Sequence, residues 1–200
     1  MQQGNRSGSQ NALMTLFQHD PAFLALVDPS PVVQAMDELL QGSHGVGSCH
    51  IVTMKGWRNR PGYKAGAFHC DEMWGTENLP AGFLEDLAPQ NMPAPLICTA
   101  LTYLNGSSHE LCPTRVIPFS HCSGRRPVAG ESSWRGQASL AAIAKPGDCL
   151  IFRCDVWHAS SSNTTKDAVR LCVETAYGAR KVAQKFWPYL DFQVCAPLPS

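Results

Sequence analysis

A series of short β-type runs, punctuated by glycine and proline, constrains this fold more than any other feature of the sequence. The runs begin after Gly47, and a Lys-Pro-Gly-Asp turn at 145–148 separates two of them. Many short strands divided by such turns are typical of antiparallel sandwiches and barrels. We expect strands at Cys49–Met54, Ala67–Asp71, Leu96–Leu104, Arg115–Pro118, Ala138–Ala144, Cys149–Arg153 and Val169–Tyr177.

Helical patterns precede the strands. Apolar residues recur at a helical spacing between Leu13 and Val27. A better-marked helix covers residues 31–41: Ser30 can cap it, a proline occupies its first turn, and Gly42 ends it. Its apolar residues form one stripe, which suits packing on a sheet. The expected fold is therefore an all-β core with flanking helices.

Length and charge set further bounds. Two hundred residues allow one domain, so we expect a disordered lead-in at 1–10 and a single domain at 11–200. Sixteen basic residues balance sixteen acidic ones, which indicates no nucleic-acid partner. No apolar run reaches the roughly 18 residues that span a bilayer, and the N-terminus lacks the apolar core of a secretory signal. We expect a cytoplasmic protein with no membrane partner.

The nine cysteines are odd in number and irregularly spaced. Because no Cys-x-x-Cys pair occurs, a structural zinc site is not expected. Several cysteines lie inside apolar segments, where a thiol is usually a small core residue. We expect reduced, structural thiols, as in cytosolic proteins.

The first candidate site is the tripeptide His69-Cys70-Asp71. On a strand, residues i and i+2 face the same side, so His69 and Asp71 project together while Cys70 faces away. One metal ion could take both side chains. Alone, a His-x-Asp tripeptide arises by chance in many proteins and is better explained as ordinary polar residues at a strand end.

A second histidine, His158, follows the apolar run at 149–152, again at a strand end. Two histidines and one carboxylate on one face leave three coordination positions open, which suits oxygen-activating iron(II). Zinc hydrolases can use similar ligands, so the three side chains do not identify the metal by themselves.

Arg170 is the third element. It lies on a strand where apolar residues alternate with it, so it faces the opposite side from them. An arginine on an inward face is costly unless it meets an anion, and its planar fork suits a carboxylate. A dicarboxylic co-substrate that chelates the metal at its other end would supply that anion. A salt bridge to Glu174 or Asp155 is the alternative.

Three segments together resemble the phytanoyl-CoA dioxygenase-like family of iron(II)/2-oxoglutarate-dependent oxygenases. They are 68–74 (FHCDEMW), 113–121 (PTRVIPFSH) and 145–158, which begins with KPGD. The middle segment, threonine-x-x-isoleucine-proline-x-serine-histidine, is the most specific. The order and spacing of the three match the family, and the resemblance covers about residues 10 to 180.

The resemblance implies a double-stranded β-helix, a jelly-roll or cupin-like barrel, with helices packed on the larger sheet and iron at its mouth. The iron ligands that it implies are His69, Asp71 and His158. The residues that it implies for 2-oxoglutarate contact are Thr114, Ser160 and Arg170. In the same reading His121 is structural and Arg115 belongs to the barrel wall.

The sequence departs from the family in two places. Phe119 stands where the family commonly has glycine, and glycine permits turn conformations that phenylalanine resists. Fewer residues than usual precede His69. Either the larger sheet is smaller, or a second copy or partner chain completes it, or the sequence is truncated. The intact Asp71 argues against the halogenating relatives, which have a small residue there.

The resemblance implies an enzyme that uses iron(II), 2-oxoglutarate and O2 to oxidise a small organic substrate, most simply by hydroxylation, with release of succinate and CO2. Two alternatives stay open. One is a catalytically weak or vestigial partner subunit of such an oxygenase. The other is a zinc hydrolase on the same barrel, which would give Arg170 and Thr114 no role.

The substrate is less constrained. The Pro/Gly-rich stretch at 72–95 lacks periodicity, and loops of that length often act as lids. Its apolar side chains favour a lipophilic small molecule, although they could equally pack the loop down: Met73, Trp74, Leu79 and Phe83. Trp157 and Trp187 fit either the pocket or the core.

Overall fold

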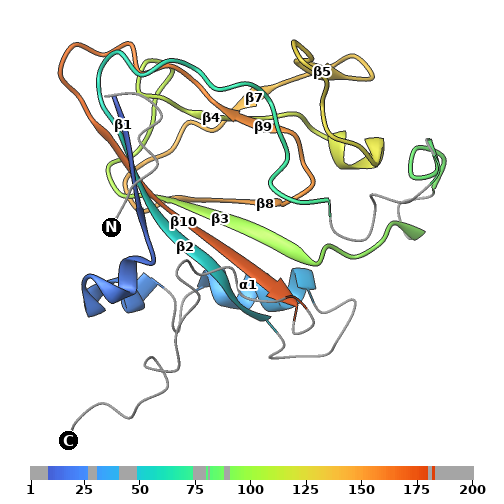
Figure 1. Cartoon of the computed structure of the whole chain (residues 1–200), viewed down its shortest axis with the longest axis horizontal. Coiled ribbons are helices and arrows are strands. Elements are labelled where there is room, and N and C mark those ends of the chain that lie inside the picture. Colours follow the sequence, from blue (N-terminus) through green and yellow to red (C-terminus); the bar gives the residue numbers. More distant parts are fainter. Residues whose placement is uncertain are drawn as a thin grey trace, which may run out of the picture.

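The computed structural model describes residues 9–26, 31–40, 49–73, 80, 82–87, 91–179 and 182. The strands in this part form two main sheets that lie one above the other (Figure 1). The larger sheet is antiparallel throughout, in the order β1 (Gln10–Met14), β2 (Cys49–Asn59), β10 (Arg170–Ala179), β3 (Ile97–Tyr103) and β8 (Cys149–Arg153).

The smaller sheet has the order β7 (Leu140–Ala141), β4 (Thr114–Val116) and β9 (His158–Ser160). A separate hairpin joins β5 (Ser133–Trp134) to β6 (Gln137–Ala138). Backbone hydrogen bonds within the described ranges do not join the two main sheets into a closed barrel. The predicted mostly-β core is confirmed, with sheets rather than a closed barrel as its observed form.

Most predicted strands are present, with shifted ends. The predicted run at 149–153 matches β8, and those at 96–104 and 169–177 match β3 and β10 to within one or two residues at each end. The run at 138–144 is divided between β6 and β7, and the run at 67–71 is reduced to one bridge at His69. β2 continues five residues beyond the predicted end at Met54 and ends at the buried Asn59.

The N-terminal segment differs from its prediction. Leu13 lies in β1, an edge strand paired with β2, and not in a helix. Two 3-10 helices follow, η1 (Leu16–Gln18) and η2 (Pro21–Leu26). The chain therefore supplies one edge strand of the larger sheet itself. Residues 1–8 of the expected lead-in lie outside the described residues, whereas Gln10 is buried at the start of β1.

The predicted helix at 31–41 is confirmed as α1 (Pro31–Leu40). Met36 and Leu40 are fully buried against Cys98, Ala100 and Tyr177 on the outer face of the larger sheet. Figure 1 shows α1 on the side of this sheet that faces away from the smaller sheet. None of the helices in the described ranges has the length and apolarity needed to cross a bilayer.

Alternation along the strands gives the larger sheet an inner and an outer face. On β10, Arg170, Cys172, Glu174 and Ala176 share the inner face. Between β10 and β2 the register shifts at Ala176/Tyr177, because one residue of β2 has no partner there. Such a bulge turns the bulged strand locally and re-aims its side chains.

The eight cysteines in the described part of the chain are free thiols. Five of them are buried, among them Cys98 and Cys172 in the core clusters. This agrees with the predicted structural role of the thiols. Cys195 lies outside the described residues.

Candidate metal centre

His69 and His158 are direct neighbours across two antiparallel segments. The backbone N–H of His69 donates to the carbonyl of His158 over 3.0 Å, and the N–H of His158 donates to the carbonyl of His69 over 2.9 Å. Their ring centroids are 4.4 Å apart. These backbone bonds pair two residues that are 89 positions apart in the chain, and both imidazoles project from the same side of the pair.

The ring orientation of each histidine is set by its own backbone. Nδ1 of His69 lies 3.1 Å from the carbonyl oxygen of Ala67, and Nδ1 of His158 lies 3.0 Å from that of Val156. A carbonyl oxygen only accepts, so Nδ1 carries a proton in both rings, and Nε2 is the electron-pair donor whenever the ring is neutral. Metal-ligating histidines commonly have this arrangement.

Asp71 completes the group. Its Oδ1 lies 3.8 Å from Nε2 of His69 and 3.6 Å from Nε2 of His158. One ligand atom from each of the three residues falls within 4.8 Å of the others. The side chains of His69 and Asp71 therefore project together, as the i, i+2 spacing predicts, while Cys70 is buried on the other side with Ile117.

The pKa values of the three side chains are shifted in different directions. Burial alone would raise the pKa of the Asp71 carboxyl, but the hydrogen bond and charge of His158 outweigh it and lower the pKa to about 2. Burial lowers the pKa of His158, yet Asp71 more than offsets burial and leaves this pKa above its ordinary value. Burial and the neighbouring His158 lower the pKa of His69. Asp71 is thus ionised at any physiological pH, and His69 is neutral.

Arg170 begins β10 and is 4% exposed. Its Nη2 donates to Oδ1 of Asn59 over 2.9 Å, and its Nη1 donates to the carbonyl of Cys112 over 3.2 Å and to Oγ1 of Thr114 over 3.5 Å. Nε has no partner among the described residues. The guanidinium is therefore buried among neutral groups.

Neither acid considered as an alternative partner bonds to Arg170. Glu174 pairs with Lys55 at 2.8 Å, and Asp155 pairs with Arg153 at 2.9 Å. The salt-bridge reading of Arg170 is therefore wrong. Within the described ranges its charge meets no carboxylate.

Thr114 and Ser160 face each other in the smaller sheet, as paired residues of β4 and β9. Thr114 is 4% exposed, and Oγ of Ser160 lies 2.6 Å from the hydroxyl of Tyr63. The structure thus brings Thr114 to Arg170, and places Ser160 beside Thr114 and two residues beyond His158.

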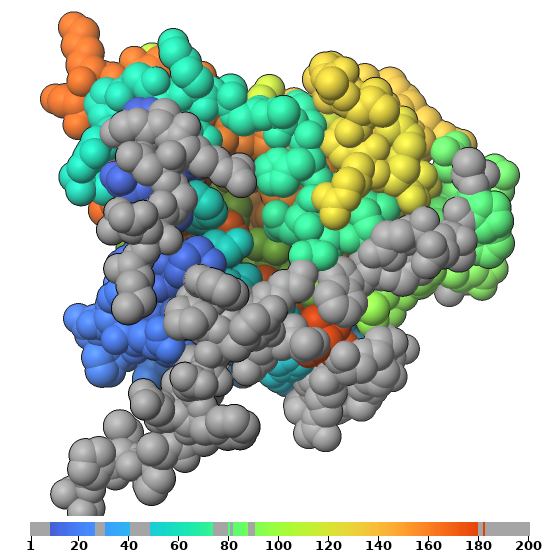
Figure 2. Space-filling view, viewed as in Figure 1, coloured from blue at the N-terminus to red at the C-terminus, as the bar shows by residue number. Residues whose placement is uncertain are grey.

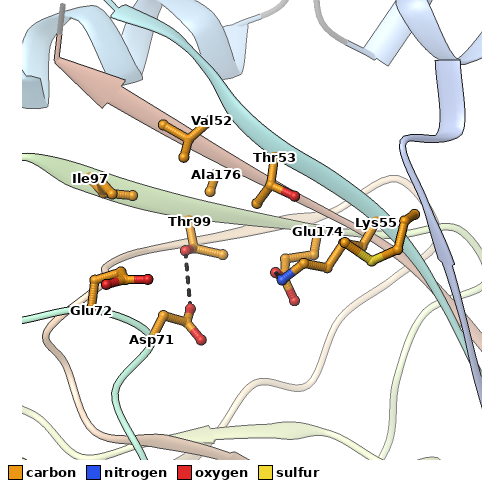
Figure 3. A pocket seen from close by; sticks show the side chains of 10 residues that line it. Val52, Thr53, Lys55, Asp71, Glu72, Ile97, Thr99, Glu174 and Ala176 are labelled. Carbon is orange, nitrogen blue, oxygen red and sulfur yellow. Dashed lines mark hydrogen bonds and ion pairs between the residues drawn. The ribbon is translucent and has the colours of Figure 1, made fainter. Parts of the chain in front are cut away.

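A cavity of about 260 Å³ adjoins Asp71 on the inner face of the larger sheet (Figure 3). Strands β1, β2, β3 and β10 and the segment around Asp71 contribute to its wall. The residues that line it are Met14, Val52, Thr53, Lys55, Asp71, Glu72, Ile97, Thr99, Glu174 and Ala176. Oγ1 of Thr99 lies 3.5 Å from Oδ2 of Asp71, and this contact connects the candidate metal ligands to β3 of the larger sheet.

The segment after β2 passes over this region towards the β5–β6 hairpin. Cys70 and Met73 pack with Trp134 and the fully buried Trp157, and Arg126 donates to the carbonyl of Cys70 over 2.7 Å. Figure 2 shows the two parts in contact on this face, in teal-green and yellow. Trp157 therefore belongs to the core, and so does Met73 of the predicted lid.

The rest of the predicted lid is less informative. Phe83 is 48% exposed, whereas Trp74 and Leu79 lie outside the described residues, as does Trp187. The structure therefore does not show an apolar cover formed by these side chains.

Phe119 has a φ of 62°, in the left-handed region that favours glycine. The turn is nevertheless formed: Oγ of Ser120 donates to the carbonyl of Ile117 over 2.7 Å and accepts the N–H of Trp157 over 2.8 Å. This turn keeps the conformation that glycine would adopt, with phenylalanine in its place.

Asn59, Tyr63 and the Lys55–Glu174 pair were not identified from the sequence. The signal for Lys55 and Asn59 was available: with Trp57 they form an i, i+2, i+4 series that continues β2 beyond Met54. Tyr63 lies in an irregular segment, where spacing predicts no facing direction.

The profile of the family described as phytanoyl-CoA dioxygenase matches residues 5–172. This range contains all six residues expected from the sequence to bind iron or 2-oxoglutarate. No curated protein sequence matches the chain.

Solved structures similar to this fold include several enzymes. The alpha-ketoglutarate-dependent epimerase SnoN from nogalamycin biosynthesis aligns with a TM-score of 0.62 and 18% identity, over 89% of this chain and 64% of its own. HygX from Streptomyces hygroscopicus with nickel and 2-oxoglutarate bound gives 0.62 and 17%, over 88% and 72%. EctD from S. alaskensis with bound iron gives 0.60 and 21%, over 84% and 56%. The chain thus shares their fold and spans less than two thirds of SnoN and EctD.

Proposed function

This chain belongs to the phytanoyl-CoA dioxygenase family, and from that premise we propose that it is an iron(II)- and 2-oxoglutarate-dependent oxygenase. The observation that carries the proposal is the convergence of His69, Asp71 and His158, with their ligand atoms within 4.8 Å of one another. The buried Arg170 adds a second, independent argument, because it marks a place for an anion.

The donor set fits iron(II). Two neutral imidazole nitrogens and one carboxylate oxygen form the three-ligand arrangement found in non-haem iron(II) oxygenases. The backbone bonds to both Nδ1 atoms direct Nε2 of each ring towards Asp71. Iron bound here would supply the activation of O2, while the protein orients the reactants and excludes water.

We assign the co-substrate site to Arg170, Thr114 and Ser160. A buried guanidinium without a counterion is costly, and it offers parallel N–H donors suited to a carboxylate. 2-Oxoglutarate has two carboxyl groups, so one can reach Arg170 while the other end lies at the metal. The Thr114 and Ser160 hydroxyls, from adjacent strands, supply further hydrogen bonds.

In this proposal the two main sheets are the walls of the double-stranded β-helix expected from the sequence. The metal group lies on the inner side of the smaller sheet, and Arg170 lies on the inner side of the larger sheet. The reaction is hydroxylation of a small organic molecule with release of succinate and CO2.

The two alternatives have weaker support. A vestigial partner subunit would fit the departure from the family at Phe119, but the turn there is formed, with Oγ of Ser120 donating to the carbonyl of Ile117. A zinc hydrolase would leave the buried charge of Arg170 without a role.

The deciding experiment measures succinate formation from 2-oxoglutarate by the purified, iron-loaded chain, screened against a library of small metabolites. We expect substrate-dependent succinate formation that is abolished in a His69→Ala/Asp71→Ala/His158→Ala variant. Turnover that persists in this variant would place the metal elsewhere. A fully iron-loaded chain that binds no 2-oxoglutarate would return the protein to the partner-subunit reading.

A further inference from the structure

The cavity beside Asp71 contains an ion pair to which the proposed chemistry assigns no role. Lys55 on β2 and Glu174 on β10 are paired residues of adjacent strands, and both side chains point into the cavity (Figure 3). Nζ of Lys55 lies 2.8 Å from Oε1 of Glu174. The side chains are only 25% and 14% exposed, so the pair is a partly buried feature of the cavity wall.

Glu174 is held on a second side. Nε1 of Trp57 donates to its Oε2 over 2.8 Å. Each carboxylate oxygen therefore accepts one hydrogen bond and keeps the capacity for another. Across the described residues, Glu174 is the one hydrogen-bond acceptor of Lys55, whose ammonium has three N–H groups. A fixed donor and a fixed acceptor thus lie side by side in the cavity wall.

The charges of this pair restrict what it can recognise. A carboxylate or phosphate would be attracted by Lys55 but repelled by Glu174, and an ammonium group would meet the reverse. Asp71 and Glu72 in the same wall further disfavour an anion. A neutral group that donates and accepts at once satisfies both partners without an unbalanced charge. An alcohol does so with one oxygen atom.

The remainder of the cavity supports a small molecule with a carbon skeleton. Val52, Ile97 and Ala176 form an apolar wall, since the bulge in β2 directs Val52 to the inside with the other two. A volume of about 260 Å³ is below the roughly 300–1,000 Å³ of sites for drug-sized ligands.

We propose that Lys55 and Glu174 recognise a hydroxyl group of the primary substrate, which is therefore a small, uncharged, hydroxyl-bearing molecule. This inference rests on the proposed function, because it takes the cavity beside Asp71 as the substrate site. It differs from the lipophilic substrate that the apolar residues at 72–95 favour.

Four ring compounds that differ in one substituent test the proposal: cyclohexanol, methoxycyclohexane, cyclohexanecarboxylate and cyclohexylammonium. Their affinities for the iron-loaded full chain can be measured by ligand-observed NMR titration without oxygen. We expect cyclohexanol to bind most tightly. In Lys55→Met and in Glu174→Gln its affinity should fall roughly tenfold or more, since each loses a hydrogen bond to a charged group.

Matched controls are Lys145→Met and Glu110→Gln, which change exposed residues and should leave all four affinities unchanged. If a single variant fails to fold because one charge stays buried alone, the neutral double variant Lys55→Met/Glu174→Gln takes its place. It should bind cyclohexanol and methoxycyclohexane equally.

Three results would overturn the proposal. The first is tighter binding of the carboxylate or the ammonium compound to wild type. The second is equal binding of the ether and the alcohol, which would favour a lipophilic substrate. The third is loss of 2-oxoglutarate affinity in the double variant, which would make the pair part of the co-substrate site. Calorimetric titration of the wild type with 2-oxoglutarate tests the proposed function separately. If 2-oxoglutarate does not bind, the preference for the alcohol over the other three compounds can still be measured.

Discussion

Arg170 and Asn59 lie opposite each other on β10 and β2, and Nη2 of the arginine donates to Oδ1 of the asparagine over 2.9 Å. A neutral amide thus orients the guanidinium without neutralising it. The charge remains available to a ligand, whereas a carboxylate at position 59 would have consumed it. This arrangement suits an anion-binding residue better than a structural one.

We predict that Arg170→Ala weakens 2-oxoglutarate binding by roughly 30- to several-thousand-fold, because a buried charge pair is worth on the order of 2–5 kcal/mol. Arg170→Lys should recover only part of this, since a point charge cannot form two parallel hydrogen bonds. Iron content should stay unchanged. Calorimetric 2-oxoglutarate affinities, with the exposed Arg58→Ala as control, check the prediction. Equal affinities in all variants would show that the anchor lies elsewhere.

Each of His69→Ala, Asp71→Ala and His158→Ala should lose iron binding and turnover. The strands around them should persist, because the His69–His158 ladder is made by backbone atoms. Iron content and circular dichroism test the two halves of this expectation. His109→Ala, which changes an exposed histidine, should behave as wild type. A single variant that keeps full iron occupancy would remove that residue from the ligand set.

Metal affinity should rise with pH through the neutral range. The pKa of His158 is raised because Asp71 outweighs burial, so its imidazolium persists above the ordinary pKa of histidine and blocks a ligand atom. The lowered pKa values of His69 and Asp71 leave both deprotonated there. Iron uptake should therefore release about one proton per site below the pKa of His158 and none above it.

Calorimetry in buffers of different ionisation enthalpy measures that proton release. The control is Asp71→Asn, which removes the charge that raises the pKa of His158 and leaves burial to lower it. Its residual metal binding should release no proton at neutral pH. A release that is independent of pH in the wild type would contradict the assignment of the proton to His158.

Removal of metal by EDTA should abolish turnover, and iron(II) with ascorbate should restore it better than zinc. Three protein ligands leave positions open for co-substrate and O2, and only a redox-active metal can use them in oxygenation. The measurement is succinate formation after each reconstitution. Restoration by zinc alone would instead support the hydrolase reading.

Phe119→Gly should stabilise the fold by up to about 1.5 kcal/mol. A left-handed backbone costs a non-glycine residue about 1–2 kcal/mol, and glycine loses about 0.5–1 kcal/mol more entropy on folding. Little burial is forfeited, because Phe119 is 65% exposed. Urea unfolding at constant slope measures the change. Phe119→Ala, which keeps the strain, should give no stabilisation; equal gains in both variants would argue against backbone strain as the cause.

Local geometry explains what the sequence could predict. The spacing of His69 and Asp71 defines their common face without knowledge of any partner, and α1 has its own start and stop signals. Arg170 was recognisable because apolar residues alternate with it along its strand, which places it on the opposite face. In each case the information lies within a few residues of the chain.

Long-range pairing explains the errors. The residue types of β1 do not follow a strand pattern, since the polar Gln10 is buried and the apolar Leu13 is 42% exposed. Only the pairing with β2 identifies this segment as a strand. The predicted end at Met54 was too early, because β2 continues through Gly56 to Asn59. An ideal Cβ at Gly56 would lie 3.0 Å from Leu16, so this glycine is explained by the close approach of the N-terminal segment.

The backbone ladder between His69 and His158 has an implication for redesign. Every amino acid except proline supplies the N–H and carbonyl groups that form this ladder, so positions 69 and 158 stay in register whatever side chains they have. Imidazole can therefore be exchanged there for thiolate, carboxylate or amide with the spacing between the two Cα atoms conserved. If the proposed metal site is right, the ligand side chains at these two positions, and with them the metal preference, could be varied without changing the fold.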